Sequence, residues 1–274
     1  MTDQSIIRRL TSSRFVLWHL ALREIRVRYK QSVLGAAWAV LVPTAMMLTF
    51  TLVFTHFAPV VQSLNTRMPY PLFVYLGLLP WMLFAQGLTQ AANSLVANRN
   101  LVTKIYFPRE VFPLSSILSA LFDFAIASSV LIVLIVYYSL TLEAGVWTFM
   151  LTPSILWLPV ILFVQLSLMA GLAMWLSMAH LFYRDVKYVL AVGLQIWMFL
   201  TNVIYPLPTS GTWGAVLTYA NPMTPIIGAY RSTLIHGQAP DPGPFLCATV
   251  MAAFLLASGH RAFRASEHRF AECV

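Results

Sequence analysis

Side chains that could do chemistry are sparse in this sequence, and one of them lies inside an apolar run. Asp123 is the only charged residue between Val111 and Leu142. A carboxylate at such a depth in a membrane either pairs with a basic side chain, accepts hydrogen bonds from hydroxyls, or relays protons. Because this acid stands alone in its segment, we expect a structural pairing rather than a proton relay.

Sequence signatures of metal centres and nucleotide sites are missing. None of the three lysines, at positions 30, 104 and 187, follows a glycine, which excludes a Walker A loop, and no G-x-G-x-x-G occurs. The histidines form no H-x-x-x-H or H-E-x-x-H pair. We therefore expect a chain that is not an enzyme and that binds neither a metal nor a cofactor of its own.

The composition places the chain in a membrane. Hydrophobic residues make up 59% of the 274 positions and charged residues 9%, whereas soluble domains carry about 25% charged residues. This excludes a soluble globular protein, a disordered protein and a nucleic-acid-binding domain, although the net charge is +8.

Charge-poor stretches predict an all-α, polytopic membrane protein with six transmembrane helices. Each stretch is close to the roughly 20 residues that a helix needs to cross a bilayer. We expect one transmembrane domain over residues 1–274, with a cytoplasmic amphipathic segment (1–34), a bundle (35–259) and a cytoplasmic tail (260–274). No removable signal peptide is expected. The crossings are Gly35–Phe57, Pro71–Ala92, Val111–Leu140, Pro153–Phe182, Tyr188–Tyr205 and Gly243–Gly259.

The distribution of basic residues predicts the orientation. Of the 17 Lys and Arg residues, only Arg67 and Arg231 fall on the side of the membrane opposite to the N-terminal segment. Cytoplasmic segments are enriched in Lys and Arg, so both termini are expected in the cytoplasm, and the basic residues there would also attract anionic lipid headgroups.

The segment Arg14–Lys30 predicts an amphipathic helix that lies on the cytoplasmic leaflet. Its apolar positions recur at helical spacing and leave the basic residues on a neighbouring face. The helix is either a membrane anchor alone or also a cuff that touches a cytoplasmic partner. The residues assigned to it are Trp18, Leu22, Arg23, Ile25, Arg26, Tyr29 and Lys30.

The longest cytoplasmic connection, Asn98–Pro113, mixes charges that we expect to be exposed with apolar residues. A short helix in it should end before Pro108, because a residue before proline avoids the helical region. Apolar side chains beside charges favour a docking surface; the alternative is that they fold back onto the bilayer interface. The candidate residues are Arg99, Leu101, Lys104, Tyr106, Phe107, Arg109 and Glu110.

Between the last two crossings, Pro206–Pro244 contains two apolar pieces that are too short to span a bilayer. Helix breakers precede Trp213–Ala220, and an Asn221-Pro222 turn separates it from Met223–His236. Such pieces are typical of interfacial or re-entrant helices, which here form either an outer gate or a surface cap. The candidate gate residues are Trp213, Tyr219, Asn221, Pro222, Tyr230 and Arg231.

Four motifs in this order resemble the membrane subunit of type-2 ABC exporters of the polysaccharide and polyol phosphate kind. They are LREIRVRYKQSVLGAAWAVLVP (Leu22–Pro43), LVTKIYFPREVFPL (Leu101–Leu114), FYRDVKYVLAVGLQIWMFLTNVIYP (Phe182–Pro206) and NPMTPIIGAYR (Asn221–Arg231). The first and last look closer to O-antigen lipopolysaccharide exporters than to the capsule or teichoic-acid branches.

The resemblance implies a division of labour between subunits. Two copies of the chain would line one channel, and two copies of a cytoplasmic ABC ATPase would dock below and hold ATP and Mg²⁺. The loop Arg99–Glu110 would be the coupling helix, Trp18–Lys30 the interface helix, and Trp213–His236 the gate. The cargo would be a lipid-linked polysaccharide that leaves the cytoplasm through the bacterial inner membrane.

Three other classes of protein stay open at this point. A proton-driven secondary transporter would need more intramembrane ionisable groups. A membrane-embedded transferase would need a carboxylate or metal cluster at one face. A structural scaffold would affect no ATPase.

Overall fold

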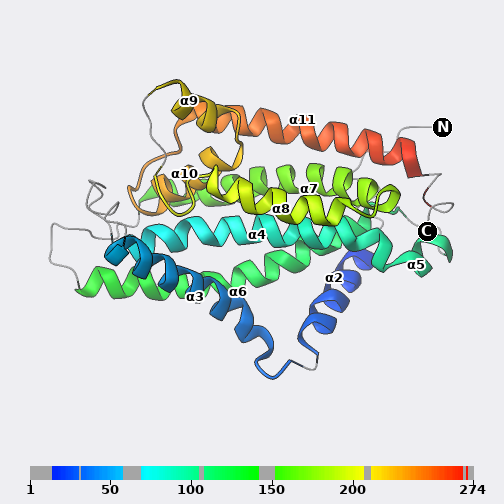
Figure 1. Cartoon of the computed structure of the whole chain (residues 1–274), viewed down its shortest axis with the longest axis horizontal. Helices are drawn as coiled ribbons and strands as arrows, with labels where there is room; N and C mark the ends of the chain where they lie inside the picture. The colour runs from blue at the N-terminus through cyan, green and yellow to red at the C-terminus, as the bar shows by residue number, and fades with distance from the viewer. Residues whose placement is uncertain are drawn as a thin grey trace.

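The computed structural model describes residues 14–30, 32–57, 69–104, 108–141, 152–206, 211–267 and 270, and within these ranges it contains helices and no strand. The predicted all-α class is confirmed. The helices are α2 (Arg14–Tyr29), α3 (Trp38–Leu52), α4 (Tyr70–Ala97), α5 (Arg99–Lys104), α6 (Val111–Thr141), α7 (Leu158–Phe182), α8 (Val186–Phe199), α9 (Thr212–Tyr219), α10 (Met223–Leu234) and α11 (Pro242–Ser266) (Figure 1).

Five helical segments in the described part are long and apolar enough to cross a membrane. Short helical turns before α3 and α7 and after α3 extend those two helices. The five segments are Gly35–His56, Tyr70–Ala97, Val111–Thr141, Pro153–Phe182 and Pro242–Ser266, and they correspond to five of the six predicted crossings. The chain is therefore a polytopic membrane protein.

The predicted fifth crossing, Tyr188–Tyr205, is wrong in its helical extent. The helix α8 has 14 residues and ends at Phe199, which at 1.5 Å per residue is about 21 Å against a hydrocarbon core of about 30 Å. Residues 200–206 continue as turns and bends. The chain can leave the helix there because side chains of Asn221, α10 and α4 bind the carbonyl groups of residues just after Phe199, as described below.

The last crossing is longer than predicted. The helix α11 continues beyond Gly259 to Ser266, so the segment assigned to a tail from residue 260 begins as helix. Phe263 in this extension is fully buried against the start of α6 and the end of α7. Burial of an aromatic side chain stabilises the added turns.

The two ends of the bundle differ in what they carry (Figure 1). The helix α5 and the C-terminal end of α11 lie at one end, which we call the α5 end, and α9 and α10 lie at the other, the α10 end. The turn between α7 and α8 is also at the α5 end, because the Phe182 ring lies 6.3 Å from that of Phe270. The segments predicted to share the cytoplasmic side thus share one end of the bundle.

The helix α4 is the central element, and buried polar contacts fix it between its neighbours. The Tyr75 hydroxyl donates to the Ala127 carbonyl on α6 at 2.9 Å. The Gln165 amide on α7 donates to the Pro80 carbonyl at 2.7 Å. Because unpaired polar groups are costly in an apolar interior, these two bonds set the register of α4 against α6 and α7.

The helices α7 and α11 cross at two glycines. A Cβ atom at Gly171 would lie 2.4 Å from the Leu255 carbonyl carbon, and one at Gly259 would lie 2.5 Å from the Gly171 carbonyl oxygen. The absence of side chains therefore lets the two backbones touch. Close contacts between small residues are a main source of helix association in membranes, and this crossing holds α11 onto the bundle.

Candidate functional site

A seam of polar side chains joins α2 to α6 near the α5 end. The Glu24 carboxylate on α2 accepts hydrogen bonds from the Ser115 hydroxyl at 3.0 Å and the Ser116 hydroxyl at 3.2 Å. One helical turn further along both helices, Arg28 donates to the Ser119 hydroxyl at 2.9 Å. The contacts advance in the same direction on α2 and α6, so the two helices lie parallel along this seam.

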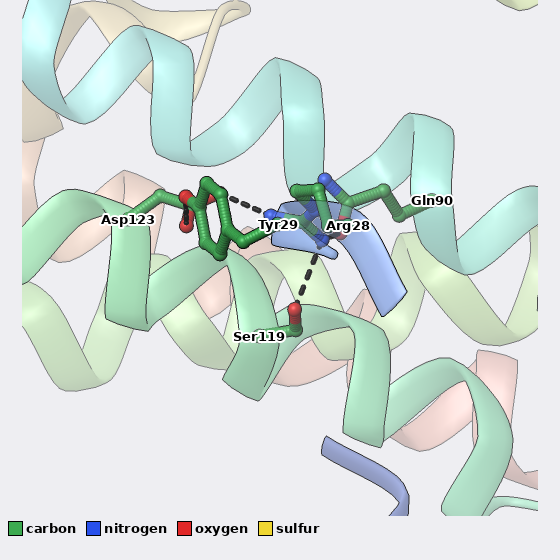
Figure 2. A network of polar contacts seen from close by, with 5 residues as sticks. All are labelled: Arg28, Tyr29, Gln90, Ser119 and Asp123. Atoms are coloured by element: carbon green, nitrogen blue, oxygen red, sulfur yellow. Dashed lines mark hydrogen bonds and ion pairs between the residues drawn. The ribbon is translucent and has the colours of Figure 1, made fainter. Parts of the chain in front are cut away.

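The seam ends at the intramembrane acid (Figure 2). The Arg28 guanidinium forms an ion pair with Asp123 and also donates to the side-chain carbonyl of Gln90 on α4. The Tyr29 hydroxyl donates to the other Asp123 oxygen at 2.5 Å. The Asp123 side chain is 11% exposed and that of Arg28 28% exposed, so both charges are largely withdrawn from solvent. The acid has both kinds of partner expected of a structural pairing, a basic side chain and a hydroxyl.

The burial of Glu24 has a consequence for stability against pH. Burial raises the pKa of the Glu24 carboxyl above its ordinary value, and its bonds from Ser115 and Ser116 oppose the shift only in part. The folded state therefore holds this proton more tightly than the unfolded state. The stability that this bound proton contributes is fully present at pH values below the ordinary pKa of 4.5. It is lost as the pH rises through the raised pKa of the folded state.

We expect Glu24→Gln to raise the unfolding temperature near neutral pH and to leave it unchanged at pH values below the ordinary carboxyl pKa. The neutral amide keeps an acceptor for the two serine hydroxyls and has no charge to desolvate. Thermal unfolding of the purified protein across that pH range measures the effect. Asp185→Asn, at an exposed carboxylate, is the control. An equal pH dependence in Glu24→Gln and the parent protein would contradict the assignment.

The face that α2 presents to the bundle differs from the predicted stripe. Leu20 and Ala21 are buried, and Glu24 and Arg28 contact side chains of α6, whereas Trp18 is 55% exposed. Of the predicted apolar stripe, Trp18 is exposed and Tyr29 reaches Asp123, and contact of the stripe with the leaflet stays a prediction. Polar partners on α4 and α6 decide which face turns inward.

The remaining residues assigned to α2 lie around the outward part of the helix. Leu22 and Ile25 are half-buried, and Arg26 and Lys30 are exposed. Arg23 is exposed and donates to the Asn98 side-chain oxygen just before α5. Contact of this outward face with lipid or with a cytoplasmic partner stays a prediction.

The predicted docking loop divides into two parts. The short helix α5 carries Arg99, which is exposed, Leu101, which is half-buried, and the backbone of Lys104. It ends before Pro108, as the sequence predicts. Tyr106 and Phe107 lie outside the described residues, so their role in docking stays a prediction.

The expectation that Glu110 is an exposed charge is wrong. Glu110 is 1% exposed, and its carboxylate lies 3.3 Å from His260 Nδ1 and 3.7 Å from Arg264 Nε on α11. Arg109 is half-buried and donates to the Glu267 carbonyl. The loop packs against α11 here because an aromatic cluster that includes Phe263 joins the start of α6 to the last turns of α11. Among the charged side chains of this loop that the structure describes, the exposed one is Arg99 on α5.

At the other end of the bundle, Asn221, which lies just before α10, caps the end of α8. The Asn221 amide donates to the Leu200 carbonyl at 3.1 Å and to the Thr201 hydroxyl at 2.8 Å, and its oxygen accepts from the Trp197 indole at 2.8 Å. A helix end leaves its last carbonyls without partners, and hydrocarbon supplies no water to satisfy them. Asn221 therefore allows α8 to stop inside the bundle.

Arg231 completes this arrangement, which we call the outer clamp (Asn221, Arg231 and Tyr70). Its guanidinium donates to the carbonyls of Asn202, Val203 and Phe73 and lies 3.7 Å from the centre of the Phe73 ring. The Tyr70 hydroxyl donates to the Ile204 carbonyl at 2.9 Å. Arg231 is 7% exposed, so this candidate gate residue is buried inside the α10 end. Its five donors suit a site made of several carbonyls.

The predicted gate residues thus separate into two groups. Trp213 and Tyr219 on α9 are 77% and 50% exposed. Pro222 and Tyr230 are buried with Asn221 and Arg231. Burial favours the structural alternative for α10, and gating stays a prediction for α9.

Several residues of these sites were missed by the sequence reasoning. Ser115, Ser119 and Asp123 recur every four residues, which places them on one face of α6, and this spacing was the available signal. Nothing in the local sequence marks Glu24 or Gln90 as members of the same polar seam. Within the described ranges, no three His, Cys, Asp or Glu side chains gather where they could hold a metal ion.

Comparison with known proteins places these features in a family. Residues 16–235 match the ABC-2 type transporter family. The chain is 30% identical over 271 residues to the O-antigen export system permease protein RfbA of Myxococcus xanthus. These residues make up 98% of this chain and 99% of the relative. It is 28% identical over 260 residues to a protein of the same description from Klebsiella pneumoniae, at 92% of each chain. The Polysialic acid transport protein KpsM of Escherichia coli is 24% identical over 221 residues, at 80% of each chain. The resemblance seen in the motifs is confirmed, and the chain belongs to the ABC-2 type transporter family.

Proposed function

We propose that the chain is the membrane-spanning subunit of an ATP-driven exporter that moves a lipid-linked polysaccharide of the O-antigen kind across the bacterial inner membrane. The observation that carries this proposal is the similarity to an O-antigen export permease over almost the whole of both chains. This similarity covers residues 16–235, which match the family, and also residues before and after them.

In this proposal two copies form the channel. The helices α3 and α8 offer exposed apolar faces that include Leu48 and Leu52 on α3 and Val192 and Ile196 on α8. Large exposed apolar surfaces are covered in the working protein by lipid or by another polypeptide. The termini lie in the cytoplasm, and two copies of an ABC ATPase dock at the α5 end, where they hold ATP and Mg²⁺.

Movement of the ATPase would reach the bundle through α5 and α2. Arg23 on α2 is bonded to Asn98 beside α5, and the polar seam ties α2 to α6. A displacement of α5 can therefore be passed on as rigid-body tilting of helices, a usual form of transport transition.

The match to KpsM supports a second cargo, a capsular polysaccharide such as polysialic acid. It is the weaker candidate, because its identity and coverage are lower than those of the O-antigen permeases.

The proposal is tested by co-expressing the chain with an ABC ATPase from the same export locus. We expect the two to co-purify, ATP hydrolysis to respond to lipid-linked polysaccharide, and glycan export to stop when the ATPase is inactivated. Arg99→Glu reverses an exposed charge on α5 and should weaken both co-purification and export, because rim charges orient docking partners. Arg261→Glu, an exposed arginine on α11, is the matched control. Export that persists without the ATPase and ceases when the proton gradient is collapsed would overturn the proposal in favour of a secondary transporter.

A further inference from the structure

An apolar groove runs between α7 and α8, away from the polar seam, and ends at Trp197, whose indole donates to Asn221 of the outer clamp. Its volume is about 500 Å³, and it is lined by Leu176 on α7 and by Val189, Gly193 and Trp197 on α8. The lining residues of α8 recur every three or four positions, so one whole face of the helix borders the groove. A Cβ atom at Gly193 would meet no atom within 4 Å, so the middle of the groove is open.

The groove has the length of one leaflet. It reaches from Asp185 at the α5 end to Trp197, which along α8 is about 18 Å at 1.5 Å per residue. Half of the hydrocarbon core is about 15 Å thick. The groove therefore follows the depth of a lipid tail in the leaflet at the α5 end, which is the cytoplasmic leaflet in the proposed orientation.

The cross-section of the groove fits a hydrocarbon chain better than a helix. All the empty space in the groove, about 920 Å³ with its open side included, divided by its length gives a mean area of roughly 50 Å², whereas a helix about 10 Å across occupies roughly 80 Å². A helix from a second copy could cover the groove but could not enter it.

The mouth of the groove carries basic residues. Arg184 follows the lining residue Tyr183, and Lys187 follows the lining residue Val186, and both side chains are exposed. Asp185 also lines the mouth and opposes an anion there. Two positive charges against one negative charge still favour a phosphate, and basic pockets between membrane helices on this side commonly hold anionic headgroups.

We propose that this groove binds an anionic glycerophospholipid, with one acyl chain along Val189, Gly193 and Trp197 and with the phosphate between Arg184 and Lys187. The lipid belongs to the leaflet and is not the transported cargo. It fills the space between α7 and α8 and so supports a helix that is too short to span the membrane.

Native mass spectrometry of the purified protein with phosphatidylglycerol and, separately, phosphatidylethanolamine tests this site. Gly193→Phe fills the open middle of the groove and should abolish the preferential retention of phosphatidylglycerol. Val250→Phe, on an exposed position of α11 that does not line the groove, should retain it. Arg184→Gln and Lys187→Gln should each weaken retention roughly fivefold, which corresponds to about 1 kcal/mol per basic residue near a lipid surface. Asp185→Asn should strengthen it.

Three outcomes would overturn the inference. Wild-type retention of phosphatidylglycerol by both Gly193→Phe and the Arg184→Gln, Lys187→Gln double variant would show that the groove is not the site. Loss of glycan export in Gly193→Phe with unchanged phosphatidylglycerol retention would assign the groove to the cargo. Disulfide-linked dimers of Gly193→Cys, with Cys247 and Cys273 replaced by serine, would show that a second copy covers the groove.

Discussion

Replacing Arg231 with methionine is expected to cause a large loss of folded protein, because it removes the donors of three carbonyl groups at once. The carbonyls of Asn202 and Val203, which lie outside any helix, would keep their positions without this donor, whereas the Phe73 carbonyl would keep its bond inside α4. A buried polar group left unpaired costs about 1–3 kcal/mol, and the membrane interior offers no water in exchange. Relief from burying the guanidinium charge offsets part of this loss. The unfolding temperature and the yield of monodisperse protein measure the effect.

Two further variants separate the outer clamp from a general effect of substitution in α10. Ser232→Ala removes a hydroxyl that bonds within its own helix, to the Ala229 carbonyl, and should be close to neutral. Gly77→Ala should reproduce much of the Arg231→Met defect, since its Cβ atom would lie 2.3 Å from the Val203 carbonyl oxygen and 2.5 Å from Arg231 Nη2. Wild-type unfolding temperatures in both Arg231→Met and Gly77→Ala would refute the clamp.

Replacing Asp123 with leucine is expected to release α2 from the bundle. The substitution leaves the Arg28 guanidinium without its ion-pair partner and the Tyr29 hydroxyl without its acceptor. Hydrogen bonds to a charged group contribute about 1.5–3 kcal/mol each, and partial exposure of Arg28 places the ion pair toward the lower end of that range. Hydrogen exchange in α2 should become faster, while exchange in α7 and α11 should not change.

A double variant that removes both charges distinguishes a structural from a functional role for the ion pair of Arg28 with Asp123. Replacing a buried ion pair by well-packed apolar residues is often neutral for stability, whereas removing one partner is not. The Arg28→Met, Asp123→Leu double variant should therefore recover most of the stability lost by Asp123→Leu alone. Arg26→Gln removes an exposed charge from the same helix and serves as the control. If the double variant folds but no longer exports, the ion pair acts in coupling as well as in folding. Slow, parent-like exchange of α2 in Asp123→Leu would show that the seam does not hold this helix.

The two polar sites have a common physical basis at opposite ends of the bundle. At the α10 end, side chains of Asn221 and of α10 satisfy the backbone where α8 stops; at the α5 end, side chains of α2 satisfy a carboxylate inside α6. Between them, the contact of Gly171 with Gly259 holds α7 and α11 together through backbone packing. Helices joined in these ways tend to move as groups, since each bond has few alternative partners in an apolar interior.

The sequence alone determined the class of protein and the positions of its helices. Long apolar runs bounded by charges predict spans, because each span must satisfy its own backbone and cover the hydrocarbon. Pro206, Gly211 and the Asn221-Pro222 turn likewise predicted the short helices α9 and α10, whose observed bounds are Thr212–Tyr219 and Met223–Leu234. The need of Asp123 for a partner also followed from sequence, since a lone acid in an apolar run must be neutralised or bonded.

Only the tertiary structure decided which groups meet. Arg28 and Asp123 are 95 positions apart, and Arg231 binds carbonyls 28, 29 and 158 positions away. The same packing buried Glu110 against α11, turned the polar face of α2 inward and ended α8 at Phe199. Helical periodicity depends on neighbours within a turn or two, whereas a buried charge or a helix end takes its partner from whichever distant element packs against it.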